Sequence, residues 1–327
     1  MEDKKYFLDE LENKASDFLN RKKLRNKTTY LNYRTSINYF IYYLYNIAEV
    51  NSIGSDNKEI LIEHFQGSLL EGFNYEVDNS NRLVKLNANA VNTHIRRTKT
   101  FLNSIGLTVE NVKALDVNKA KYKSLKPEEI KLLISECSNK WTNEEIAIRN
   151  KTLIIFLFNT AFRINEALNI TLHDFYKENG SYYVRIHEKG KAKGILTPVL
   201  ISNNTAELLQ DYIKIKSVPS DYIFSSIKAT KSGKAKQLRR ENFNKYIIDL
   251  AKYVDLKYNT NIYNIVENNS SHVFRHSKAT YLLNVKKEDI ITVKEVLRHK
   301  SIDSTLIYLN PEEEKINSVR VNNDIII

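Results

Sequence analysis

The sequence predicts a mainly α-helical protein with a small β-hairpin or sheet, an α+β chain organised as two domains. Its 327 residues exceed what a single hydrophobic core usually absorbs. Only 8 Gly and 4 Pro are present, which favours long helices and disfavours an all-β sandwich or a glycine-rich phosphate loop. Apolar residues recur at three- and four-residue steps along most of the chain, whereas strand-like patterns are seen at residues 182–187 and 195–201.

The first half of the chain is expected to be wholly helical. The apolar spacing predicts helices at residues 4–18, 30–50, 59–70 and 90–105. A hydroxyl at Thr28 or Thr29 would cap the second of these helices. Residues 1–115 are therefore predicted to form a helical N-terminal domain.

A basic linker is expected at residues 116–126, where the apolar period is lost and lysines accumulate. The next helix is predicted to begin at Pro127, and the two glutamates that follow suit the positive end of its dipole. This second domain, residues 127–310, joins the two predicted strands by a turn at 189–194. Its further helices are predicted at residues 144–162, 165–175, 205–215, 240–254, 271–283, 290–298 and 303–308.

The charge balance points to a polyanionic partner. Lys and Arg total 50 against 39 Asp and Glu, a net charge of +11. Nucleic acid fits this excess better than an anionic membrane surface, and a merely solvated lysine-rich surface is the alternative. The candidate DNA contacts lie on the predicted helix at 90–105 and in the acid-free stretch 228–240, and they are Arg96, Arg97, Lys99, Lys234, Lys236, Arg239 and Arg240.

The single cysteine excludes two other classes of protein. With Cys137 alone, neither an intrachain disulfide nor a cysteine-based metal cluster can form, and we expect a buried structural thiol rather than a nucleophile. The longest apolar run, residues 153–158, is too short to span a bilayer, and the first residues lack the apolar stretch of a signal peptide. A cytoplasmic protein with no membrane partner is expected.

Three short stretches carry the functional signal. Arg163 and Glu166 lie in the pattern R-x-x-E-x-L, His272 and Arg275 form H-x-x-R, and the stretch Leu297-Arg298-His299 is followed by Tyr308 nine residues after the histidine. In this order and at these spacings they resemble the signature of the tyrosine recombinases, or phage integrases, the family of lambda integrase, Cre and the Xer proteins. The resemblance covers about residues 123–310 and is closest in character to Xer-like recombinases.

The resemblance implies a site-specific DNA recombinase that cuts and rejoins strands through a 3′-phosphotyrosine at Tyr308 and a Holliday junction. It implies a two-domain C-shaped clamp, with a helical core-binding domain before the catalytic domain. The enzyme could be a Xer-like recombinase or a mobile-element integrase or excisionase. Two other readings stay open: a catalytically inactive DNA-binding accessory factor, and a type IB-like topoisomerase.

The residue types suit this chemistry. The guanidinium groups of Arg163 and Arg275 can each hold phosphate oxygens with two parallel hydrogen bonds. By the resemblance, His272 would help to deprotonate Tyr308, His299 would donate a hydrogen bond to the phosphate, and neither metal nor other cofactor would be needed. Glu166, one helical turn after Arg163, would support its guanidinium. His276 is expected to face another side of its helix, and no catalytic role is assigned to it.

The family supplies a general acid, a lysine, from the hairpin between the two strands. Here the spacing departs from the usual K-G-x-K pattern. Lys189 keeps the following Gly190 and places Pro198 nine residues on, whereas Lys191 places Pro198 seven residues on. A one-residue insertion at the turn is the simpler account, so Lys189 is favoured and Lys191 remains the alternative.

The implied partners are double-stranded DNA with an inverted-repeat site and further copies of the chain. In the family, the segment after the nucleophile docks in a neighbouring protomer, so the tail 311–327 is expected to link dimers and tetramers on DNA. Its three terminal isoleucines would be an unusual sequence to leave in water. The alternative is that the tail packs on its own catalytic domain; accessory proteins are left open.

Overall fold

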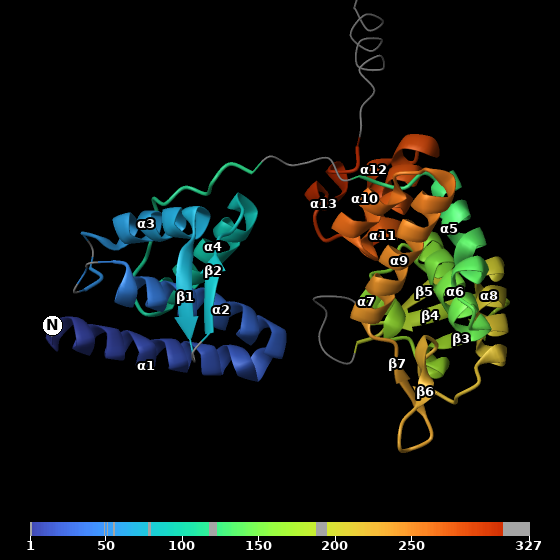
Figure 1. Ribbon diagram of the computed structural model, residues 1–327, viewed down its shortest axis with the longest axis horizontal. Helices are drawn as coiled ribbons and strands as arrows, with labels where there is room; N and C mark the ends of the chain where they lie inside the picture. Colours follow the sequence, from blue (N-terminus) through green and yellow to red (C-terminus); the bar gives the residue numbers. More distant parts are fainter. Residues whose placement is uncertain are drawn as a thin grey trace, which may run out of the picture. The chain divides into compact units, whose positions relative to one another are not determined.

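The computed structural model describes residues 2–48, 50, 52–54, 56–77, 80–117, 123–187 and 195–309 (Figure 1). The chain divides into two compact units, Met1–Lys119 and Ala120–Ile327. This division lies within the stretch 116–126, for which a linker is expected.

The first unit packs its helices around one aromatic and aliphatic core. Its elements are α1 (Glu2–Arg25), α2 (Lys27–Asn46), α3 (Lys58–Glu71), β1 (Phe73–Val77), β2 (Ser80–Val84) and α4 (Ala88–Ser104). Helix α1 packs on α2, and α2 and α3 both pack on α4. Phe40, Phe65 and Phe101 are fully buried where these helices meet.

The prediction that residues 1–115 are wholly helical is wrong, because β1 and β2 form an antiparallel hairpin in which Phe73 lies opposite Val84. Four of the five β2 residues are exposed, so apolar alternation could not reveal the strand. The guanidinium of Arg82 lies 5.5 Å from the ring centres of both Tyr39 and Tyr75, and this cation–π stacking attaches the hairpin to α2.

The expected cap of α2 is also wrong. Neither Thr28 nor Thr29 caps the helix: the side chain of Asn26 accepts a hydrogen bond from the backbone N–H of Thr29 at 3.0 Å. Helix α1 runs to Arg25, so Asn26 alone separates the two helices. The Lys and Arg residues before Asn26 are good helix formers, which explains why α1 extends past the predicted end at residue 18.

The second unit holds the remaining elements. The helices are α5 (Pro127–Lys140), α6 (Glu144–Thr160), α7 (Ile164–Leu168), α8 (Asn203–Ile215), α9 (Arg240–Tyr258), α10 (Ile262–Asn269), α11 (His272–Thr280), α12 (Ile290–Leu297) and α13 (Asp303–Leu306). Short 3-10 and π-helical turns lie at Leu172–Asp174 and Tyr281–Val285. The strands are β3 (Phe175–Glu178), β4 (Ser181–Ile186), β5 (Thr197–Ile201), β6 (Ser225–Ala229) and β7 (Ala235–Gln237).

Two small antiparallel sheets accompany these helices. One has the order β3-β4-β5, with Val184 opposite Val199, and confirms the two predicted strands; the other is the β6-β7 hairpin. Strand β3, the β6-β7 hairpin and α10 were not predicted. Figure 1 shows α10 to α13, in orange and red, grouped at one end of the unit in this view.

The main core of the second unit lies between α5, α6, α8 and α9. Cys137 is fully buried there, and burial raises the pKa of its thiol to about 12, as expected for a structural cysteine. Glu136 next to it joins α5 to the end of α9: its carboxylate accepts hydrogen bonds from Lys257 at 2.8 Å and Tyr258 at 2.6 Å. These bonds lower the pKa of Glu136 to about 2.

A separate hydrophobic cluster fixes the end of the described chain. It is formed by the buried side chains of Ala161, Ala279, Leu283, Val293, Leu297 and Tyr308. These residues come from the end of α6, from α11 and the turn after it, from α12, and from the turn after α13. The cluster therefore brings together the three sequence stretches that carry the functional signal.

Candidate active site

The first stretch forms a tight arginine–glutamate pair at the start of α7. Arg163 is the N-cap residue of this helix, and its backbone N–H donates to Glu166 at 2.9 Å. The Arg163 guanidinium donates to the other carboxylate oxygen at 2.8 Å. Glu166 is only 6% exposed, and its burial by itself would raise its pKa. The hydrogen bonds from Arg163 and the charge of Arg298 outweigh this effect and lower the pKa of Glu166.

Arg275, on α11, is buried where two helices end. Its guanidinium donates to the carbonyl of Ala161, after α6, at 2.6 Å, and to the carbonyl of Leu297, the last residue of α12. Helix C-termini carry partial negative charge, which stabilises the buried cation. Burial, with the charges of Arg163 and Arg298, lowers the pKa of Arg275 to about 9. Arg275 therefore remains protonated at neutral pH.

Arg298 joins this group, although the sequence pattern predicts no role for it. Its guanidinium donates to Glu166 at 2.9 Å and lies 4.5 Å from the ring centre of Phe162. The residue has a left-handed backbone conformation, with φ of 53°, at the end of α12. Glu166 therefore bridges two guanidinium groups. Arg298 stands at the unspecified position x of the L-x-H pattern, so no signal in the sequence could have revealed it.

His299 and Tyr308 are linked through the short helix α13. The His299 ring makes a 2.8 Å hydrogen bond with the Thr305 hydroxyl, and its backbone N–H donates to the carbonyl of Lys294 at 3.0 Å. The rings of His299 and Tyr308 are nearly parallel, with centres 6.3 Å apart. Burial, followed by the charges of Arg275, Arg163 and other cations, lowers the pKa of His299 to about 4.

The orientation expected for His276 is wrong. Its Nδ1 makes a 2.5 Å hydrogen bond with the Tyr308 hydroxyl, and the two ring centres lie 5.3 Å apart. His276 lies four residues after His272, so the two share one face of α11, and that spacing was the signal available in the sequence. His272 is exposed at the first residue of α11, with its ring centre 6.2 Å from that of His276.

Lys189 and Lys191 lie outside the described residues, in the segment between β4 and β5. The candidate DNA contacts lie in two other places. Arg96, Arg97 and Lys99 are on α4 of the first unit, with Arg96 exposed. The others are exposed residues on the β6-β7 hairpin and at the start of α9: Lys234, Lys236, Arg239 and Arg240. Lys234 pairs with Asp221 at 2.9 Å, and Arg240 pairs with Glu241 at 3.2 Å.

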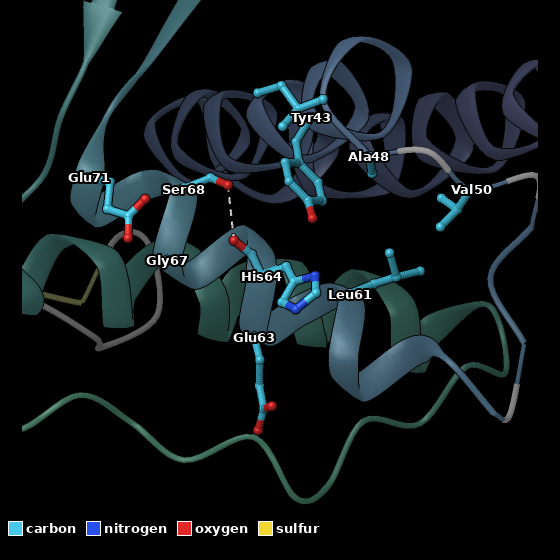
Figure 2. Close-up of a pocket in the computed structure, with 10 residues that line it drawn as sticks. Tyr43, Ala48, Val50, Leu61, Glu63, His64, Gly67, Ser68 and Glu71 are labelled. Carbon is cyan, nitrogen blue, oxygen red and sulfur yellow. Dashed lines mark hydrogen bonds between the residues drawn. The ribbon is translucent and has the colours of Figure 1, made fainter.

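A hollow of about 560 Å³ lies between α2 and α3 in the first unit (Figure 2). Tyr43, Glu63, His64 and Glu71 contribute to its lining. The dashed bond in Figure 2 runs from the Ser68 hydroxyl to the backbone carbonyl of His64, an ordinary bond along one helix. The residues that line the hollow lie outside the three sequence stretches that carry the functional signal.

Within the described parts of the chain, no cluster of three or more His, Cys, Asp and Glu side chains is arranged to hold a metal ion. No helix in the described ranges is long and apolar enough to cross a membrane.

Solved structures share this fold. The XerH site-specific recombinase bound to difH substrate aligns with a TM-score of 0.64 at 20% identity, over 94% of this chain and 83% of that one. The Tn1549 transposon integrase in complex with circular intermediate DNA aligns with a TM-score of 0.68 at 13% identity, over 95% and 98%.

Sequence relatives match about three fifths of the chain. Tyrosine recombinase XerC of Rickettsia bellii is 27% identical over 201 residues, 61% of this chain and 59% of that protein. Tyrosine recombinase XerH of Helicobacter pylori is 27% identical over 195 residues, 59% of this chain and 49% of that protein. The matched segments thus span between 49% and 59% of these two relatives. The sequence model of the phage integrase family matches residues 123–315, which is more than half of the chain. The chain therefore belongs to the phage integrase family, the tyrosine recombinases.

Proposed function

We propose that this chain is a site-specific DNA recombinase that cuts and rejoins DNA through a 3′-phosphotyrosine at Tyr308. The placement of Tyr308 carries the proposal. Its hydroxyl contacts a histidine nitrogen, and its ring packs in the same cluster as Ala161 and Leu297, whose carbonyls hold Arg275. Transfer of a phosphoryl group to tyrosine needs a nucleophile, cations for the phosphate oxygens and nearby proton carriers, and this group provides all three.

Arg163 and Arg275 are proposed to hold the two non-bridging oxygens of the scissile phosphate. Negative charge gathers on these oxygens in the transition state, and donors already in place stabilise it there most strongly. Glu166 supports the arrangement, because it fixes the guanidinium of Arg163. His272 and His299 are proposed to donate hydrogen bonds to the same phosphate.

The departing 5′-oxygen needs a proton. We assign this role to Lys189 on the segment between β4 and β5, with Lys191 as the alternative. A lysine there can deliver its proton as the bond to phosphorus breaks, which is general acid catalysis.

Both units are proposed to contact the DNA backbone. The net charge of +11 supports this, as do the basic residues on α4 and on the β6-β7 hairpin. The first unit, with residues 1–115, would be the core-binding domain, 116–126 the linker, and 127–310 the catalytic domain. Two solved proteins of this fold, the XerH recombinase and the Tn1549 integrase, are in complex with DNA. We also propose that the chain acts in the cytoplasm.

The proposed DNA partner is an inverted-repeat site with two arms. A two-fold arrangement of protein on DNA requires arms of that kind. We propose dimers on a full site and tetramers on paired sites, linked by exchange of the tail 311–327, which lies outside the described residues. A head-to-tail exchange of this sort closes into a ring.

The test is capture of covalent protein–DNA complexes from a library of duplex DNA, including the DNA flanking the gene. The protein is incubated with the library, denatured and purified, and the linked strands are sequenced. We expect linkage to one sequence with inverted arms, and no linkage with Tyr308→Phe, which lacks only the attacking oxygen. Robust relaxation of supercoiled plasmids of any sequence would instead indicate a topoisomerase. DNA binding without linkage by the unaltered chain would indicate an accessory factor.

A further inference from the structure

The contact between His276 and Tyr308 is held from both sides by packing. Tyr308 is 6% exposed and belongs to the cluster that includes Ala279 and Leu283, one from the helix that carries His276 and one from the turn after it. Asn284, on that turn, also donates to the backbone carbonyl of Tyr308 at 3.2 Å. The 2.5 Å distance between Nδ1 and the phenol oxygen therefore belongs to a fixed arrangement of α11 and the end of α13.

The charges around His276 favour its neutral form. Burial, followed by His272, Arg275 and His299, lowers the pKa of His276 to about 4. A neutral imidazole has one nitrogen that accepts a hydrogen bond, and a phenol has one proton to donate. In the arrangement that satisfies both groups, Tyr308 donates to Nδ1 and the ring carries its own proton on Nε2.

Among these groups, the charge of Arg275 also acts on Tyr308. Arg275 remains cationic and interacts favourably with the negative charge of an ionised Tyr308. A phosphate bound beside these cations would offset part of their repulsion toward a protonated His276, which makes the ring a better base when DNA is present.

We infer that His276, rather than His272, takes the proton of Tyr308 during strand cleavage; this inference rests on the function proposed above. In the step, the Oη–H bond breaks and the proton moves to Nδ1 of His276, while Oη forms its bond to phosphorus. The bond from phosphorus to the 5′-oxygen breaks, and that oxygen takes a proton from the lysine between β4 and β5, Lys189 or Lys191. In rejoining, a 5′-hydroxyl gives its proton back to the lysine as its oxygen forms a bond to phosphorus, the bond from phosphorus to Oη breaks, and His276 returns the proton to Tyr308.

The kinetic test uses single-turnover cleavage of the DNA site recovered by covalent capture. His276→Asn places an amide oxygen where Nδ1 was, so it can accept the hydrogen bond but not the proton. We expect at least about a 100-fold loss of cleavage with DNA affinity unchanged. The matched control is His173→Asn, which changes an exposed histidine of the same unit and should cleave within twofold of the unaltered chain.

Two chemical substitutions separate a proton acceptor from a structural residue. A bridging 5′-phosphorothiolate has a leaving group that needs no proton, so it should not restore cleavage by His276→Asn. Replacing Tyr308 by a fluorinated tyrosine, whose phenol ionises more readily, should restore part of it. The same replacement should not help Arg163→Lys, in which a phosphate contact is altered and not the proton transfer.

A measurement without DNA tests the direction of the hydrogen bond. In protein labelled with ¹⁵N-histidine, we expect the His276 Nδ1 signal at neutral pH to be that of a bare ring nitrogen, and to change in Tyr308→Phe. A protonated Nδ1 would overturn the inference, as would cleavage by His276→Asn at the normal rate. If the unaltered chain forms no covalent complex, the proposed function itself fails, and the inferred proton transfer fails with it.

Discussion

Glu166 shows how a single buried carboxylate organises the residues around Tyr308. One of its oxygens binds the Arg163 guanidinium, and the other binds Arg298 and the backbone N–H of Arg163. Because these contacts lower its pKa, the carboxylate stays ionised at neutral pH. Breaking either ion pair would leave an uncompensated buried charge, which is costly. The pairs with Glu166 therefore hold Arg163 and Arg298 in place. The position of the Arg163 guanidinium is therefore set before any phosphate binds.

The first prediction concerns the guanidinium of Arg163. Arg163→Lys keeps the positive charge but loses the planar pair of donors, so cleavage should fall well over tenfold while duplex affinity changes little. Single-turnover cleavage and gel-shift titrations measure the two quantities. Arg185→Lys is the control, since Arg185 lies on β4 and contacts Tyr176 and the carbonyl of His173. Equal losses of affinity and cleavage would make Arg163 an ordinary binding residue.

The second prediction concerns the left-handed backbone of Arg298. Arg298→Ala and Arg298→Gly both remove the bond to Glu166, but only glycine adopts a φ of 53° without steric cost. We expect the glycine variant to be more stable than the alanine variant by about 1 kcal/mol. Urea unfolding of both proteins measures the difference. Equal stability of the pair would mean that the backbone at this position is not strained.

At the scale of whole elements, the sequence predicted what local chemistry determines. Proline and two glutamates marked the start of α5, and alternation marked β4 and β5. The β1-β2 hairpin escaped because β2 is mostly exposed, and its attachment depends on the stacking of Arg82, a tertiary contact. Of the candidate site, spacing identified the residues of the known pattern. The four-residue spacing places His276 on the same face of α11 as His272, but its contact with Tyr308 depends on how α11 packs against the end of α13, which that spacing does not encode.

The third prediction concerns the segment between β4 and β5. The two strands are paired in register, with Ile186 opposite Thr197, so they hold both ends of the segment that carries Lys189 and Lys191. Lys189→Ala should lose cleavage, and a bridging 5′-phosphorothiolate substrate should restore it because that leaving group needs no general acid. Lys191→Ala should need no such rescue. The reverse pattern would move the role of general acid to Lys191.

At the scale of the whole molecule, three histidines couple stability to pH. His94, His276 and His299 each have a pKa lowered to about 4, chiefly by burial. The unfolded chain, with histidine pKa values near 6.5, binds more protons than the folded chain between these limits. The stability that these histidines contribute is therefore fully present above about pH 6.5 and is lost as the pH drops toward 4.

The fourth prediction tests this coupling by urea unfolding at pH 7 and pH 5. His94→Phe keeps an aromatic ring against Tyr39, on which His94 stacks, but cannot be protonated. The loss of stability between the two pH values should be smaller in His94→Phe than in the unaltered protein. His173→Asn, at an exposed site, is the control and should show the unaltered dependence. A pH dependence that His94→Phe leaves unchanged would contradict the assignment.

Tyr308, Arg163 and Arg275 all belong to the second unit of one chain. This arrangement bears on which subunit cleaves which DNA strand. Tyr308 packs with Ala161 and Leu297, the residues whose carbonyls hold Arg275. We propose that each chain cuts in cis, on the strand that its own arginines hold. A mixture of Tyr308→Phe and Arg163→Ala subunits should show no complementation on paired sites, since neither chain can lend the other its missing group. Cleavage restored by mixing would mean that the tyrosine is delivered in trans.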